Sequence, residues 1–135
     1  MSQTIFVVLL VLVDQVSKIW AGSLGWETRL NTGGAFGILG GKSWLQTITY
    51  WLLIAVLAIG LFRRKSIKSV SFRNGFLLLL SGGIGNTLDR ILYGGVRDFI
   101  HLPFWPSFNV ADVYITMGIV LILSEKIIWR TRYFI

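Results

Sequence analysis

The sequence predicts an all-α integral membrane protein with four transmembrane helices and a small extracytoplasmic β-rich segment between the first and second helices. Of the 135 residues, 54% are hydrophobic and the mean hydropathy is +0.70, which is too apolar for an ordinary soluble domain. The basic residues lie between and after the apolar runs, where they set the orientation of membrane proteins. No linker or internal repeat divides the chain, so residues 1–135 are expected to form a single membrane-embedded domain.

Four apolar runs approach the length of about 20 residues that a helix needs to cross the hydrocarbon layer. They cover about residues 5–20, 44–62, 72–93 and 110–128. Five lysine and arginine residues directly follow the second run, and further basic residues close the chain. Because short cytoplasmic loops carry the excess of positive charge, we expect this loop and both termini in the cytoplasm. The other two connections are then expected on the outer side.

Each outer connection has a composition that argues against a continuous helix. Residues 21–42 are rich in glycine, and residues 29–36 alternate weakly, which predicts short strands or a tight turn at the membrane surface. Asn31 is the residue there best suited to bind a peptide backbone, since its amide both donates and accepts hydrogen bonds; the alternative is that it caps a turn. Residues 101–107 combine two prolines with aromatic side chains, which predicts a surface segment in the headgroup layer.

Composition also excludes several classes of function. The chain has no cysteine and one histidine, so neither a thiolate nor a histidine metal site is expected, and no cofactor is predicted. The net charge of +7 does not indicate nucleic-acid binding, because the cations are distributed between apolar runs. His101, beside the aromatic segment, is expected to be interfacial rather than a catalytic base. The N-terminal residues lack a basic region and a cleavage site, so the first run is read as a retained span.

Polar residues recur at helical spacing within the apolar runs. Asp14 and Lys18 are four residues apart with the acid first, the favourable order for an ion pair on one helix face. Asn86 and Arg90 repeat at the same spacing in the third run, with Asp89 beside them. Ionisable residues within a membrane are costly and are found facing other helices, so these faces are expected to point into the bundle.

Asp98 and Asp112 are the candidate catalytic pair. The expected topology brings Asp98, just after the third run, and Asp112, in the first turn of the fourth, to the same depth near the outer face. Two carboxylates that share a site hold one proton between them, which allows the hydrolysis of a peptide bond without a covalent intermediate. The sequence contains neither a His-Glu-x-x-His nor a Gly-x-Ser-x-Gly motif, and Ser17 and Lys18 do not face one another on a helix. On these residues alone, proton or ion translocation stays open beside peptide hydrolysis.

Several motifs, in order, resemble those of the lipoprotein signal peptidases, also called signal peptidase II. They are Asp14-x-x-x-Lys18, Asn31-Thr32-Gly33-Gly34-Ala35-Phe36, Gly82-Gly83-Ile84-Gly85-Asn86-x-x-Asp89-Arg90, Gly95-Val96-Arg97-Asp98-Phe99 and Phe108-Asn109-x-Ala111-Asp112. The resemblance extends from the first apolar run to the fourth, and the last three motifs together are highly specific.

This resemblance implies an aspartic protease of the bacterial inner membrane with four spans, cytoplasmic termini and an active site near the outer leaflet. Its substrate would be a diacylglyceryl-modified prolipoprotein, cut before the lipidated cysteine, and it would be inhibited by globomycin-type cyclic peptides. It implies no metal or organic cofactor, and its partners would be the substrate and membrane lipid. The family's catalytic aspartates fall on Asp98 and Asp112. The residues that would hold the substrate or position the pair are Asn31, Asn86, Arg90 and Asn109; those that would stabilise the bundle are Asp14, Lys18 and Asp89.

The alternative function is a small proton- or ion-conducting membrane protein with its acids arranged as a relay. Such a relay needs acids at several depths of the bilayer. The expected topology instead places the four candidate aspartates in the outer halves of their spans or beyond; they are Asp14, Asp89, Asp98 and Asp112.

Overall fold

The computed structural model describes residues 2–33, 43–63 and 70–133, and these contain four helices. The helices are α1 (Gln3–Ser23), α2 (Ser43–Arg63), α3 (Val70–Tyr93) and α4 (Val110–Tyr133). Each contains one of the four predicted runs and extends beyond it at one or both ends. The prediction of a helical protein built on these four runs is therefore confirmed.

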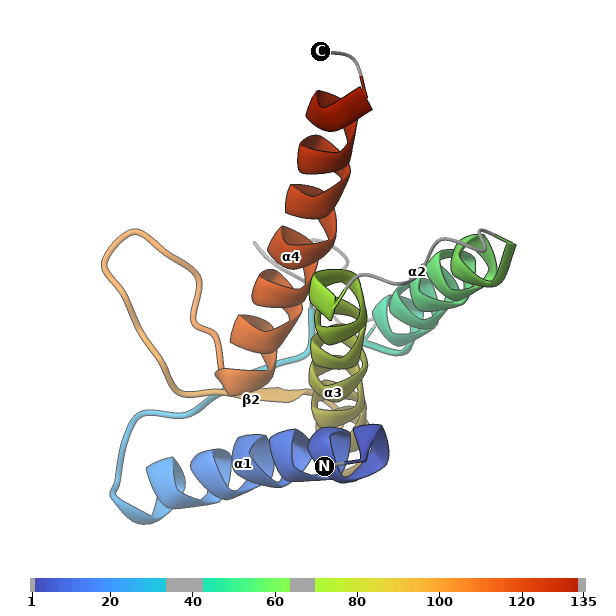
Figure 1. Ribbon diagram of the computed structural model, residues 1–135. Helices are drawn as coiled ribbons and strands as arrows, with labels where there is room; N and C mark the ends of the chain where they lie inside the picture. The colour runs from blue at the N-terminus through green and yellow to red at the C-terminus, as the bar shows by residue number, and fades with distance from the viewer. Residues whose placement is uncertain (1, 34–42, 64–69, 134–135) are drawn as a thin grey trace.

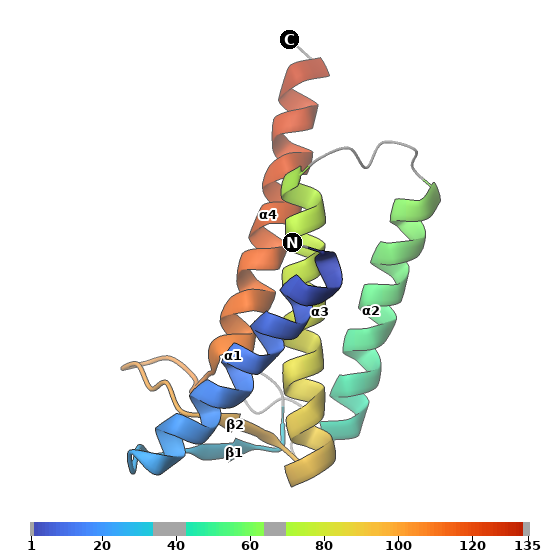
Figure 2. The same cartoon turned by 60° about the horizontal axis from the view of Figure 1, so that its bottom comes forward.

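The helices α3 and α4 lie side by side and form the centre of the molecule (Figures 1 and 2). α1 crosses them, and α2 lies against α3. Glycines bring α3 and α4 together: a Cβ atom on Gly82 would lie 2.5 Å from the carbonyl oxygen of Ala111, and one on Gly118 would lie 2.6 Å from that of Gly75. Small residues at a helix interface allow the two backbones to approach closely, as is common in membrane proteins.

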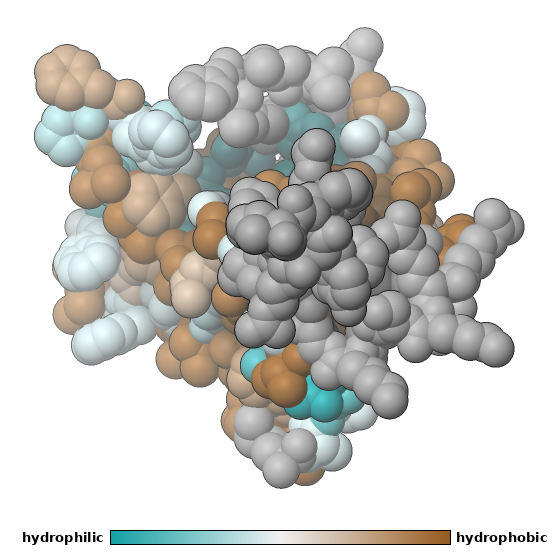
Figure 3. Space-filling model, turned by 45° about the horizontal axis from the view of Figure 1, so that its top comes forward, coloured by the Kyte–Doolittle hydropathy of each residue, from teal (hydrophilic) through white to brown (hydrophobic). Residues whose placement is uncertain are grey.

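Apolar side chains cover much of the outside of the molecule, while the buried apolar cluster is small. That cluster joins Ile54, Leu79 and Ile122 from α2, α3 and α4. Large hydrophobic residues are exposed along α1 in particular, and brown apolar residues account for much of the coloured surface in Figure 3. Among the described residues, α1 has the length and hydropathy of a membrane span, and the apolar stretches Trp44–Ile59 and Val110–Ser124 are shorter. An exterior this apolar is suited to lipid rather than to water.

Two short strands pair antiparallel at one end of the bundle (Figure 2). β1 (Arg29–Asn31) lies in the connection between α1 and α2, where strands were expected, and residues 34–36 of that predicted segment lie outside the described residues. Its partner β2 (Val96–Asp98) follows α3, and the sequence did not predict it. The β segment is therefore not confined to the connection between the first two helices but joins it to the connection between α3 and α4.

The connection between β2 and α4 forms a closed loop that projects from the bundle (Figure 1). Ile100 and Phe108 exchange backbone hydrogen bonds at its base, with N···O distances of 2.9 and 3.1 Å. Phe104, at its tip, is fully exposed and has a positive φ of 63°. The loop contains no helix, as its two prolines predict.

Candidate active site

Asp98 is held in strand β2 with both carboxylate oxygens occupied by amide donors. Asn31 donates from Nδ2 to Oδ2 at 3.0 Å, and Asn109 donates from Nδ2 to Oδ1 at 2.7 Å. The strand register explains the first contact: Asn31 pairs with Val96, two residues before Asp98, and residues two apart lie on the same face of a strand. Only 1% of Asp98 is exposed to solvent.

The environment of Asp98 favours its protonated form. Burial is the largest influence and raises the pKa of Asp98 to about 6, against the hydrogen bonds from Asn31 and Asn109, which lower it. The negative charge of Asp112 raises the pKa further. Asp98 is thus suited to exchange a proton near neutral pH.

Asp112 is held at the start of α4 by reciprocal capping. Asn109, the residue before the helix, accepts a hydrogen bond at Oδ1 from the backbone nitrogen of Asp112 at 3.1 Å. Asp112 in return accepts at Oδ2 from the backbone nitrogen of Asn109 at 3.2 Å. This is the capping-box arrangement, here built from asparagine and aspartate, and it fixes the carboxylate at the positive end of the helix dipole.

A chain of side-chain amides connects the two carboxylates. Asn86 on α3 donates from Nδ2 to Oδ1 of Asp112 at 2.8 Å. Asn109 donates to Oδ1 of Asn86 at 3.2 Å as well as to Asp98. The predicted pair is therefore assembled from β2 and α4, and Asn86 supplies the connection to α3.

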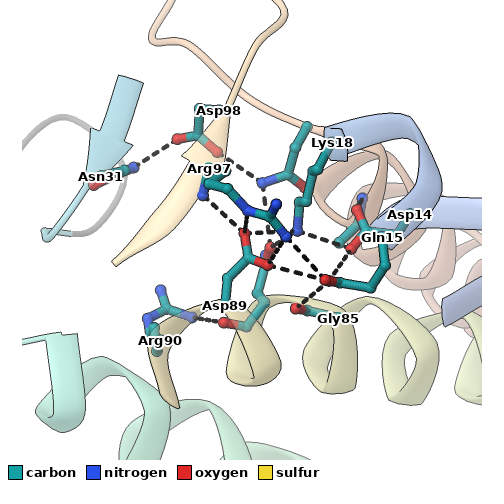
Figure 4. Close-up of polar contacts among 12 residues, drawn as sticks. Asp14, Gln15, Lys18, Asn31, Gly85, Asp89, Arg90, Arg97 and Asp98 are labelled. Carbon is teal, nitrogen blue, oxygen red and sulfur yellow. Dashed lines mark hydrogen bonds and ion pairs between the residues drawn. The ribbon is translucent and has the colours of Figure 1, made fainter. Parts of the chain in front are cut away.

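The predicted polar residues of α1 and α3 form a buried ionic cluster beside this pair (Figure 4). The ammonium of Lys18 lies 2.8 Å from Oδ2 of Asp14 and 3.3 Å from Oδ2 of Asp89, and all three side chains are inaccessible to solvent. It also donates to Oδ1 of Asn86 at 3.3 Å. Because an ammonium only donates, this contact fixes the orientation of the Asn86 amide, whose Nδ2 then points to the carboxylate of α4. Asp14 in addition accepts from the backbone nitrogen of Ala111 at 2.9 Å and so ties α1 to the start of α4.

Arg97 and Gln15 complete this cluster, and the sequence interpretation missed both. Arg97 contacts Asp89 through Nη2 at 2.8 Å and through Nε at 3.2 Å, and it lies over the ring of Tyr93 at 4.3 Å from the centroid. Gln15 donates to Asp89 at 3.1 Å and accepts from Arg97 at 2.9 Å. The signal that could have found Arg97 was the charge balance: one ammonium cannot neutralise two buried aspartates.

Arg90 does not contact either carboxylate of the pair. Its Nη2 donates to Gln46 on α2 at 3.2 Å, and its Nη1 lies 3.5 Å from the carbonyl oxygen of Asn86. Its buried Nε has no hydrogen-bond partner among the residues that the structure describes. This nitrogen is a donor that remains available.

Within the described ranges, no group of three or more histidine, cysteine, aspartate or glutamate side chains is arranged to hold a metal ion. His101 lies 2.8 Å from the carbonyl oxygen of Glu27, on the exposed side of the loop that follows β2.

The family model described as Signal peptidase (SPase) II matches residues 6–128, which is most of the chain. The chain belongs to the signal peptidase II family. Its relatives in that family include a lipoprotein signal peptidase of Syntrophomonas wolfei, which is 40% identical over 129 residues, with 85% of each chain covered. Another, from Streptococcus agalactiae, is 33% identical over 142 residues, with 93% of this chain and 90% of the relative covered.

A solved structure described as a bacterial membrane enzyme, determined by the in meso method at 2.3 Å resolution, has a similar fold. Its TM-score is 0.83 at 27% sequence identity, and the match covers 97% of this chain and 90% of that one. As a member of the signal peptidase II family, the chain is a peptidase, and its structural relative agrees with a location in the membrane.

Proposed function

We propose that this chain is an aspartic endopeptidase of the bacterial inner membrane that removes the signal peptide from diacylglyceryl-modified prolipoproteins. We propose cleavage immediately before the lipidated cysteine. The observation that carries the proposal is the buried connection from Asp98 through Asn109 and Asn86 to Asp112, in a member of the signal peptidase II family.

Asp98 and Asp112 are the proposed catalytic residues. With one proton on the pair, the ionised carboxyl takes a proton from a water molecule while the water oxygen forms a bond to the scissile carbonyl carbon. The protonated carboxyl then gives its proton to the amide nitrogen as the carbon–nitrogen bond breaks. Atoms and protons balance without a covalent intermediate or a metal.

The substrate-binding residues in this proposal are Asn31, Asn86, Arg90 and Asn109. The three asparagines contact the aspartates and so set the directions of the carboxylate oxygens, which is catalysis by positioning. Arg90 is the residue with a spare donor, because its Nε is unpaired among the described residues, and a peptide carbonyl of the substrate is the acceptor that we propose for it.

The proposed placement has four spans, both termini in the cytoplasm and the active site near the outer leaflet. The cluster of basic residues between the second and third apolar runs supports this orientation. Membrane lipid would then surround the exposed apolar faces, and the lipid tails of the substrate would stay in or against the bilayer.

Proton conduction is the alternative, and the side-chain arrangement does not favour it. Asp14 and Asp89 both contact Lys18, which reaches Asn86, the side chain that donates to Asp112. Asp98 joins the same network through Asn109. These acids thus form one connected cluster, whereas a relay needs separated steps across the bilayer.

The test is cleavage of a diacylglyceryl-modified prolipoprotein by the purified protein in detergent, with the unmodified precursor as control. We expect lipid-dependent cleavage that globomycin blocks. Asp98→Asn and Asp112→Asn should abolish it while the variants remain folded and monodisperse. Normal turnover by either variant would refute the assignment of the pair, and proton flux in liposomes without cleavage would favour the alternative.

A further inference from the structure

Arg97 lies in the middle of β2, directly before Asp98, and its side chain extends away from the aspartate pair toward α1 and α3 (Figure 4). We propose that Arg97, together with Gln15, is a positioning residue for Asp98, holding strand β2 against α1 and α3. This inference rests on the proposed function, since it assigns a role toward one of the two proposed catalytic groups.

Three bonds fix Arg97 to a single carboxylate on α3. The backbone nitrogen of Arg97 donates to Oδ2 of Asp89 at 2.9 Å, and the guanidinium contacts both oxygens of Asp89, at 2.8 and 3.2 Å. A guanidinium that engages both oxygens of a carboxylate fixes direction as well as distance. The strand is thus attached to α3 by its main chain and its side chain at the same residue.

Gln15 extends this attachment to α1. Its Oε1 accepts from Arg97 at 2.9 Å, while its Nε2 donates to Asp89 and to the carbonyl oxygen of Gly85, each at 3.1 Å. One amide side chain therefore connects β2, α1 and α3. The ring of Tyr93 lies 4.3 Å from the guanidinium carbon and limits its movement on another side.

The strand geometry transmits this restraint to the active site. Successive side chains of a strand point to opposite faces, so with Arg97 directed to the helices its neighbour Asp98 is directed to Asn31 and Asn109. The two residues share a peptide unit, and a twist of β2 that releases one would redirect the other. On the opposite strand, Leu30 pairs with Arg97 and offers no polar contact that could replace these bonds.

Charge balance adds a second restraint. Asp14 and Asp89 are fully buried beside Lys18, and Arg97 supplies the second positive charge. Without it, one ammonium would face two carboxylates and would be drawn from Asn86, which it contacts at 3.3 Å. Asn86 is the donor to Asp112, so loss of Arg97 would affect both members of the pair.

The test compares Arg97→Met and Arg97→Lys with Arg29→Ala as a matched control. Arg29 also lies in the two-stranded sheet, but its ion pair with Glu27 is exposed, with 63% and 65% of the two side chains accessible. We expect Arg97→Met to lower kcat by about 10- to 100-fold with KM changed less than about twofold, because orientation and not binding is lost. Arg97→Lys, which keeps the charge, should fall between Arg97→Met and the unchanged protein, and Arg29→Ala should retain full activity.

Hydrogen exchange followed by mass spectrometry provides a readout that does not depend on activity. Amides of residues 96–98 should exchange faster in Arg97→Met and in Gln15→Leu than in the unchanged protein, with exchange in α4 beyond its first turn unaltered. If Arg97→Met does not fold, Arg97→Lys and Gln15→Leu provide the same comparison. Unchanged kcat per folded molecule and unchanged exchange in these variants would overturn the inference. Normal activity of Asp98→Asn would instead contradict the proposed function, so the two failures are distinguishable.

Discussion

The contact between α3 and α4 at Gly82 permits a quantitative prediction for Gly82→Ala. The added Cβ would lie 2.5 Å from the backbone oxygen of Ala111, whereas Cβ atoms in real structures essentially never come closer than 3.0 Å to such an atom. A backbone oxygen cannot rotate away, so the helices must separate locally by about 0.5 Å. Because Ala111 directly precedes Asp112, the bond from Asn86 would lengthen from 2.8 Å by a similar amount.

Overpacking of this kind costs about 1–3 kcal/mol of unfolding free energy. The replacement of glycine by alanine in a helix offsets this by up to about 1 kcal/mol. Gly22→Ala is the matched control, since Gly22 lies in α1 with nothing within 4 Å of an added Cβ. The helix-propensity gain is common to both variants, so Gly82→Ala should be less stable than Gly22→Ala by about 1–3 kcal/mol.

The assay is thermal unfolding of the purified variants in detergent, followed by circular dichroism, together with prolipoprotein cleavage. We expect Gly82→Ala to unfold several degrees below Gly22→Ala and to show about 10-fold lower kcat, because a displacement of this size disturbs the alignment of the reacting groups. Equal midpoints for the two variants would show that α3 and α4 do not approach as closely as described. Reduced stability with an unchanged kcat would refute the connection from this contact to Asp112.

Two further predictions concern the aspartate pair. Folding raises the pKa of Asp98 from 3.8 to about 6, so the stability that Asp98 contributes is present at low pH and is lost as the pH rises through about 6. The thermal unfolding midpoint should therefore fall, relative to that of Asp98→Asn, between pH 4 and pH 7. A constant difference between the two midpoints would contradict this. Serine at position 109 can restore the helix cap but not the hydrogen bond from the side-chain amide to Asp98. Asn109→Ser should therefore be more stable to thermal unfolding than Asn109→Ala by about 1 kcal/mol, while both variants lose most of their cleavage activity. An active Asn109→Ser would show that the cap is sufficient.

Hydropathy predicted the four helices because the apolar runs are long. Helical spacing also predicted the pair of Asp14 and Lys18, which lie 2.8 Å apart. Strand β2 was missed because three residues are too few to show an alternating pattern, and its partner β1 lies more than 60 residues earlier in the chain.

The expected topology placed Asp98 and Asp112 near each other, and the resemblance named Asn86 and Asn109 as residues that hold the substrate or position the pair. Which atoms these asparagines contact could not be predicted. The cap that Asn109 makes at the start of α4 is a local contact with Asp112, three residues along the chain; that the same amide also contacts Asp98 depends on tertiary packing. The partners of Arg97 were unpredictable for the same reason, since Gln15 is 82 positions away in the chain. Local patterns determine which residues are polar and buried, whereas their partners follow from the crossing of the helices.

The double role of Asn109 makes the proposed active site depend on the first turn of α4. Fraying of that turn would break the cap, the contact with Asp98 and the contact with Asn86 in a single event. That turn is buried, since Asn109 and Ala111 are inaccessible to solvent and the backbone nitrogen of Ala111 donates to Asp14 on α1. The geometry of the proposed pair therefore depends on a single helix turn and on the side chains packed around it.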